Sequence, residues 1–187
     1  MNEQTHRPFG VKQSIDDTLM GRIAKGDKEA LQELYDCICG SVYGFALSIV
    51  KNPQDADDVL QETFIRVYVK AADYIPRGKP LSWIFTIVRH LSMDKLREKG
   101  STYPLEEAIP VDQLRNVADA DCRMALENLL THLADEERQI IILHTIQGLT
   151  FREIAGVLDR PFNTVLSKYY RGIKRLKSLA EEGHYEK

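Results

Sequence analysis

The residues with the clearest chemistry are cations gathered near the end of the chain. Between positions 148 and 177 seven cations stand against two acids. Lysine and arginine bind phosphate, and arginine also grips the edge of a guanine base. This composition predicts contact with a nucleic acid rather than proton transfer. The seven are Arg152, Arg160, Lys168, Arg171, Lys174, Arg175 and Lys177.

Two further charge clusters lie earlier in the sequence. Residues 77–99 hold six cations against two acids, whereas residues 55–62 hold four acids and no cation. The net charge of −3 averages over these clusters and conceals them. Two basic patches and one acidic patch suggest two contacts with a polyanion and one contact with a different kind of partner.

No arrangement of residues predicts an enzyme or a bound cofactor. The sequence has no P-loop, no GxGxxG and no HExxH, and its five histidines are scattered. The cysteines, Cys37, Cys39 and Cys122, lack the spacing of a zinc site. We therefore expect no catalytic residue, no metal, no cofactor and no small-molecule substrate.

Helical periodicity positions these clusters. Apolar residues recur at three- and four-residue steps over 28–51, in a helix after it that ends near 72, and over 81–97. Asn52 and Pro53 are typical of a helix start. The pattern weakens over 101–121 and resumes over 122–133, with a helix capped by Asp135 after it, a short helix opened by Thr150 and Glu153, and a last helix over 162–179. The expected fold is all-α, with two small helical lobes joined by a flexible linker.

The second lobe has the spacing of a helix-turn-helix. Ala155 is small enough for a close helix crossing, Asp159 falls at the tight turn, and Val165 anchors the second helix. Aspartate tolerates the left-handed backbone that such a turn needs. With Val165, Tyr169, Gly172 and Leu176 turned inward, the outward face carries hydrogen-bonding, aromatic and cationic side chains, as in a helix that reads the major groove.

Two sets of motifs together resemble one family. DADDVLQETFIRV from Asp55, WIFTIVRHL from Trp83 and DKLR from Asp94 resemble region 2 of the extracytoplasmic-function (ECF) sigma factors of bacterial RNA polymerase. LTFREIA from Leu149 and RPFNTVLSK from Arg160 resemble their region 4. The resemblance implies region 2 over 14–100, a linker over 101–121 and region 4 over 122–180.

The resemblance also implies a role for each charged patch. Core polymerase would bind the acidic face of Asp55, Asp58, Gln61 and Glu62. The melted, single-stranded minus-ten element of the promoter would bind Arg77, Lys79, Ser82, Trp83, His90 and Arg97. The double-stranded upstream, minus-thirty-five element would bind Arg160, Asn163, Thr164, Ser167, Lys168, Tyr170, Arg171 and Lys174. Such a protein directs promoter recognition, melting and transcription initiation, and its usual further partner is an anti-sigma factor.

The residues leave other readings open. The N-terminal lobe can instead be a sensor in a one-component regulator that binds its operator as a dimer, and an enzyme is a more distant alternative. Trp83 is equally compatible with a core position, and Phe64 is expected in the core. The longest uninterrupted apolar run, at 140–143, is far shorter than a membrane span, and the N-terminus has no signal-peptide core. We therefore expect a cytoplasmic location.

Overall fold

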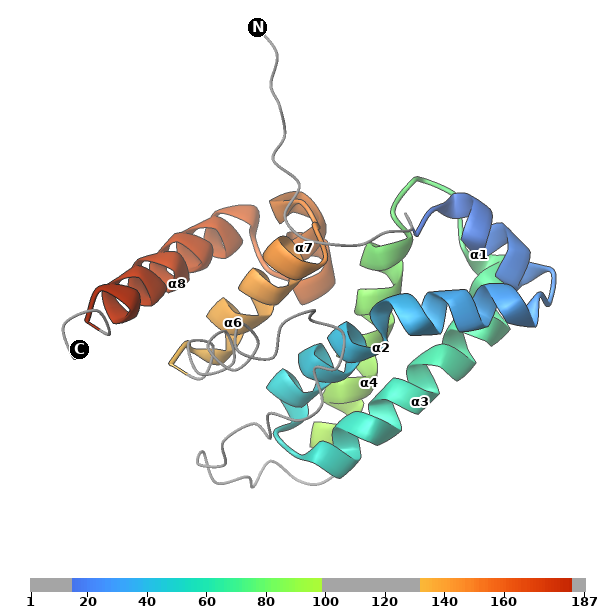
Figure 1. Cartoon of the computed structure of the whole chain (residues 1–187), viewed down its shortest axis with the longest axis horizontal. Coiled ribbons are helices and arrows are strands. Elements are labelled where there is room, and N and C mark those ends of the chain that lie inside the picture. The colour runs from blue at the N-terminus through green and yellow to red at the C-terminus, as the bar shows by residue number, and fades with distance from the viewer. Residues whose placement is uncertain (1–14, 99–131, 183–187) are drawn as a thin grey trace, which may run out of the picture.

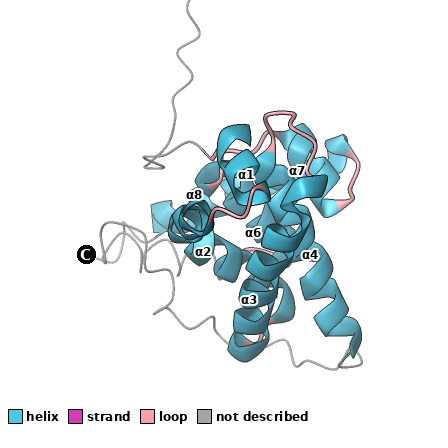
Figure 2. Ribbon diagram, turned by 90° about the vertical axis from the view of Figure 1, so that its right-hand side faces the viewer, coloured by secondary structure: helices cyan, strands magenta, loops and turns pink. Residues whose placement is uncertain are grey.

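The computed structural model describes residues 15–98 and 132–182, and every regular element within these two ranges is helical (Figures 1 and 2). The first range holds α1 (Asp17–Ala24), α2 (Lys28–Val50), α3 (Pro53–Lys70), the short 3₁₀ turn η1 (Ala71–Asp73) and α4 (Pro80–Glu98). The second holds α6 (Asp135–Ile141), the π-helical turn η3 (Ile142–Ile146), α7 (Phe151–Leu158) and α8 (Phe162–Glu182). The predicted all-α fold is confirmed, whereas the helix expected over 122–133 and the linker over 101–121 fall almost wholly outside the described residues.

Local signals start α3 and α7 as the sequence predicts. The Asn52 side chain caps α3 by accepting the backbone N–H of Asp55 at 3.0 Å, and Pro53 takes the first helical position. Thr150 and Glu153 form the predicted capping box of α7. One cap differs from the prediction. The N-cap of α6 is Ala134, without a side-chain bond, and Asp135 lies in the first helical turn instead.

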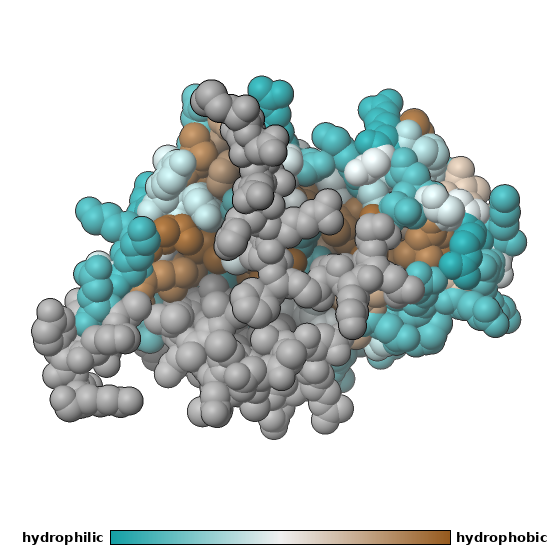
Figure 3. Space-filling view, turned by 45° about the horizontal axis from the view of Figure 1, so that its top comes forward, coloured by the Kyte–Doolittle hydropathy of each residue, from teal (hydrophilic) through white to brown (hydrophobic). Residues whose placement is uncertain are grey.

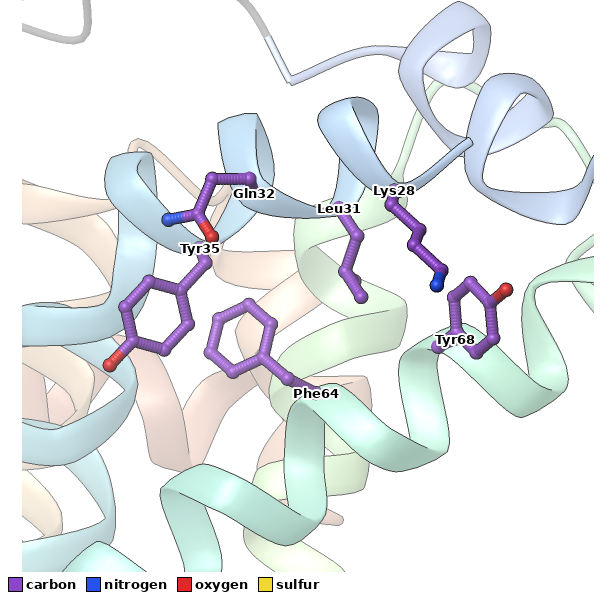
Figure 4. A pocket seen from close by; sticks show the side chains of 6 residues that line it. All are labelled: Lys28, Leu31, Gln32, Tyr35, Phe64 and Tyr68. Carbon is purple, nitrogen blue, oxygen red and sulfur yellow. The ribbon is translucent and has the colours of Figure 1, made fainter. Parts of the chain in front are cut away.

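In the N-terminal lobe, α2, α3 and α4 pack around large apolar side chains. Phe45 of α2 and Phe85 of α4 are fully buried and meet edge to face, with ring centroids 5.4 Å apart. Phe64 is buried as expected, and its ring lies against Tyr35 of α2 at 4.8 Å. Figure 4 shows these two rings in a shallow groove between α2 and α3, which Lys28, Leu31, Gln32 and Tyr68 complete.

The helix α2 is long and apolar enough, by length and composition, to cross a membrane. Half of its most apolar window is buried, and the helix packs against α3 and α4. These contacts favour a core helix of a helical lobe. The expectation that no segment approaches a membrane span therefore holds for uninterrupted apolar runs, but not for α2 as a whole.

The two lobes pack against each other. Residues of α7 contact α4, residues of α6 contact α2, and one continuous apolar core includes Ile84 and Val88 of α4 together with Ile154 and Val157 of the second lobe. Lys51 at the end of α2 forms an ion pair with Asp135 at the start of α6. Where grey residues do not cover the view in Figure 3, hydrophilic side chains surround apolar patches on both halves.

Candidate nucleic-acid interface

Four of the residues predicted for the minus-ten element lie around one hollow beside the start of α4. Arg77 and Lys79 come from the preceding loop, and Ser82 and Trp83 come from the first turn of the helix. The hollow has a volume of about 330 Å³, and Asp73, Tyr74, Ile75 and Thr86 complete its lining. Trp83 is half-buried, with its ring centroid 5.4 Å from that of Tyr74. It therefore packs against the core and also lines the hollow.

The loop that carries Arg77 and Lys79 is held by a carboxylate from α1. Asp17 accepts a hydrogen bond from the Tyr74 hydroxyl at 2.6 Å and another from the Gly78 backbone N–H at 2.8 Å. Gly78 has a φ of 67°, a left-handed conformation that glycine adopts without strain. Burial, followed by the bond to Asp17, raises the pKa of Tyr74, so the hydroxyl stays a donor. Asp17 thus fixes the shape of the hollow.

His90 and Arg97 lie beyond the hollow, further along α4. Both side chains are exposed, and Arg97 forms an ion pair with Asp94 at 2.7 Å. Trp83, His90 and Arg97 follow one another at steps of seven positions. That spacing is close to two helical turns and places the three on one side of α4.

The second lobe presents the predicted helix-turn-helix. Asp159 between α7 and α8 has φ 50° and ψ 54°, the left-handed conformation expected at the turn. Val165 is fully buried, and a Cβ added at Gly172 would lie 2.8 Å from Cδ1 of Ile141, so α8 passes close to α6. The side chains predicted to face outward are all exposed, namely Asn163, Ser167, Tyr170, Arg171 and Lys174.

Two glutamates at the start of α6 lie against the cations of this face. The Glu136 carboxylate accepts hydrogen bonds from Arg160 at 2.7 and 3.1 Å and pairs with Lys168 at 2.9 Å. Glu137 is buried, and its oxygens lie 3.8 Å from Nε of Arg171 and 3.9 Å from Nη1 of Arg175. Cations on α8 and the turn are therefore joined to α6 by neighbouring carboxylates.

The acidic face on α3 differs from the prediction at one residue. Asp55 is only 4% exposed, so it cannot serve as a contact on the outer surface. It lies near Lys95 of α4, whose pKa is raised mainly by the hydrogen bond to Asp58 at 2.8 Å, with a smaller electrostatic contribution from Asp55. Asp58 is half-exposed, Gln61 is exposed, and Glu62 pairs with Arg66 at 2.8 Å. The outward face is reduced to Asp58, Gln61 and Glu62.

Comparisons with known proteins bear on both lobes. A family model for sigma-70 region 2 matches residues 34–102, and one for sigma-70 region 4 matches residues 123–176. The chain is 30% identical over 170 residues to the ECF RNA polymerase sigma factor SigK of Mycolicibacterium vanbaalenii, covering 86% of this chain and 87% of that protein. It is 28% identical over 171 residues to the ECF sigma factor SigW of Bacillus subtilis, covering 83% and 91%.

The chain belongs to the ECF sigma factors of RNA polymerase. As a sigma factor it binds core RNA polymerase and promoter DNA and directs transcription initiation. Of the functions left open by the sequence, this membership supports the sigma factor, because both family regions match in the expected order.

Solved structures share the fold of this sigma factor. CnrH in complex with the cytosolic domain of CnrY superposes with a TM-score of 0.60 at 23% identity, covering 89% of this chain and 97% of that one. RpoE of Bartonella quintana in complex with the anti-sigma factor NepR also gives 0.60, at 22% identity, covering 80% and 96%.

Sequence reasoning missed three residues that shape the surfaces of the sigma factor. Asp17 and Tyr74 hold the loop of the hollow, and Glu136 joins Arg160 to Lys168. Each acts through a contact between segments distant in the chain, so no local pattern marked it. Within residues 15–98 and 132–182, the histidines, cysteines and acids form no group suited to a metal ion.

Proposed function

We propose that this sigma factor divides its work among three surfaces, with region 2 over 14–100, a linker over 101–121 and region 4 over 122–180. The exposed cationic face of α8 would read the upstream element. The hollow beside α4 would hold bases of the melted minus-ten element, and the outer face of α3 would bind core polymerase. The observation that carries this proposal is the exposed row on α8 directly after the left-handed turn at Asp159.

The α8 face suits a double-stranded target. Its exposed positions combine hydrogen-bonding groups with Arg171 and Lys174. In a helix-turn-helix the N-terminal turns of the recognition helix lie in the major groove. Arg171 can grip a guanine edge, whereas Lys174, almost one turn further on, is placed for phosphate. Arg160, Asn163, Thr164 and Lys168 would position the helix on the backbone of the same groove.

The hollow beside α4 suits a single strand. Unstacked bases bind proteins by stacking on aromatic rings in a cationic groove. Trp83 and Tyr74 offer the rings, while Arg77 and Lys79 offer the charge at the exposed rim. His90 and Arg97 would continue this path along α4. Binding energy alone would keep the bases unstacked, so no catalytic group is required. We therefore also propose that the chain carries no catalytic activity.

The outer face of α3 suits a protein with a basic surface. Asp58, Gln61 and Glu62 lie within two helical turns, and Ile65 directly beyond them is 57% exposed. Acids beside an exposed apolar side chain match a partner that offers cations next to an apolar contact. We assign this partner to core polymerase, which a sigma factor must bind. Because RNA polymerase acts in the cytoplasm, we propose the same location for this chain.

An anti-sigma factor is proposed as a further partner. The solved structures that share this fold include a sigma factor bound to the anti-sigma factor NepR and CnrH bound to the cytosolic domain of CnrY. A chain whose lobes already pack together offers such a partner a single composite surface.

Run-off transcription with core polymerase tests the three-surface proposal. The chain should direct transcripts from a defined set of genomic promoters, and mapping their start sites should return two sequence elements. Scrambling the upstream element should weaken binding by the α8 face, and scrambling the minus-ten element should abolish melting. If transcripts start without either element, the assignment of the two DNA surfaces is wrong.

A further inference from the structure

One carboxylate joins the turn of the helix-turn-helix to its recognition helix. Glu136 in the first turn of α6 accepts both Nε and Nη2 of Arg160 on one oxygen and pairs with Nζ of Lys168 through the other. Arg160 belongs to the turn after α7, and Lys168 lies in the second turn of α8. The bridge therefore spans three elements of the second lobe.

The two cations of the bridge stabilise the charged form of Glu136. Burial of Glu136 opposes its ionisation, but the hydrogen bonds and charges of Lys168 and Arg160 outweigh this and lower the pKa of the carboxyl. The carboxylate is therefore charged at neutral pH. One negative charge on Glu136 faces the two positive charges of Arg160 and Lys168. The three side chains together therefore keep a net positive charge, while the two cations are held in place.

This arrangement affects specific and non-specific DNA differently. Non-specific binding depends on the total cationic charge and little on its orientation. Specific binding depends on phosphate contacts that fix the register of the recognition helix, and cations held in place lose less freedom when they form them. A carboxylate that lowers net charge but fixes two cations thus disfavours the first kind of binding more than the second.

We propose that Glu136 is a specificity-determining, positioning residue of the upstream-element surface. It holds Arg160 and Lys168 in the register that the correct DNA needs and reduces their attraction for any other DNA. The inference rests on the proposed role of the α8 face. It concerns a residue outside that face, which would act through the two cations it holds.

The test uses the full chain with core polymerase on promoter DNA carrying either the preferred or a scrambled upstream element, at several salt concentrations. Glu136→Gln keeps the size of the side chain but removes its charge. We expect affinity for the scrambled element to rise roughly three- to tenfold and the salt slope to steepen by about one unit. Affinity for the preferred element should change little, so the ratio between the two should fall. Helicity and binding to core polymerase should stay unchanged.

Two further variants separate position from charge. Glu136→Asp keeps the charge but is one methylene shorter, so it cannot span both cations, and we expect the ratio to fall without the full rise in non-specific affinity. Glu29→Gln removes the same charge from the exposed first turn of α2 and should leave the ratio unchanged.

The outcomes distinguish this inference from the function beneath it. If the wild-type protein binds both elements equally, the proposed role of the α8 face fails. If the wild-type protein prefers the correct element but Glu136→Gln leaves the ratio unchanged, through no change or through an equal rise on both, the inference is overturned and the face keeps its role.

Discussion

Lys79, on the loop before α4, forms an ion pair with Glu153 in the first turn of α7, with 3.5 Å between Nζ and Oε1. One partner lies at the rim of the proposed minus-ten hollow, and the other belongs to the capping box of the helix-turn-helix. The pair thus joins the rim of this hollow to the first helix of the helix-turn-helix. Together with the shared apolar core, it holds the lobes close together.

The lobes should separate when the protein occupies a promoter. Elements centred near minus ten and minus thirty-five are about 25 base pairs apart, or roughly 85 Å at 3.4 Å per step. Two domains of this size in contact have centres only about 30 Å apart. Fluorophores at Val69 in α3 and Lys177 in α8, both exposed, should show efficient energy transfer in the free chain and weak transfer with core polymerase on a promoter. Equal transfer in both states would mean that the packed arrangement persists on DNA.

Core binding by the proposed face of α3 should depend on Asp58 and Glu62 and not on Asp55. Asp58→Lys combined with Glu62→Lys should lower affinity for core polymerase at least tenfold while helicity stays unchanged, because both side chains reach the outer surface of α3. Asp57→Lys, an exposed neighbour on a different side of α3, is the matched control. Asp55→Asn should instead lower the free energy of unfolding by about 1–3 kcal/mol, since that carboxylate is buried. Retained core affinity in the double variant removes this face from the interface.

Alanine substitutions of Arg171 and Lys174 on α8 should weaken DNA binding in different ways. Arg171→Ala should cost about 1–3 kcal/mol of promoter binding, with at least part of the loss specific to the preferred upstream element. Lys174→Ala should weaken binding to all sequences alike and lower the salt slope by about one unit. Binding to preferred and scrambled elements at several salt concentrations measures both. An equal loss for Arg171→Ala on the two elements would make this residue a backbone clamp.

The capping box of α7 should give the fold an acid-sensitive component. Burial opposes the charge of Glu153, but bonds from the Thr150 backbone and hydroxyl, with Lys79 nearby, lower its pKa. Because the folded pKa lies below the unfolded value of about 4.3, the stabilisation is complete above that value and is lost as pH falls through the folded pKa. Glu153→Gln should lower the free energy of unfolding by about 0.5–1 kcal/mol at pH 7. In urea titrations the difference from wild type should shrink as pH falls below about 4.3, and a difference that stays constant across the acid range would contradict the assignment.

Replacing Asp159 in the turn with glycine should stabilise the fold. A non-glycine residue in the left-handed region is strained, and Asp159 has a φ of 50°. Asp159→Gly should raise the free energy of unfolding by up to about 1 kcal/mol, and Asp159→Val should lower it by about 1–2 kcal/mol. Urea denaturation measures both changes. A loss of stability with glycine would show that the aspartate side chain contributes more than its backbone costs.

The sequence by itself determined the longer helices, the caps of α3 and α7 and the outward face of α8. These features depend on residues within about four positions of each other, so periodicity, Asn52 with Pro53, Thr150 with Glu153 and the turn at Asp159 were sufficient. A helical wheel also fixes which side of a helix a residue takes, which is why the side chains predicted to face outward on α8 are exposed.

Only the tertiary structure decided what lies opposite each side chain. The wheel placed Asp55 with Asp58, but α4 ends beside the start of α3 and Asp55 is buried there. The partners Asp58 and Lys95 are 37 residues apart, and Glu136 and Arg160 are 24 apart. Lys51 and Asp135, which join the lobes, are 84 apart. Such pairs arise from the packing of helices and leave no periodic trace, because charge and spacing along one helix carry no information about the helix that packs against it.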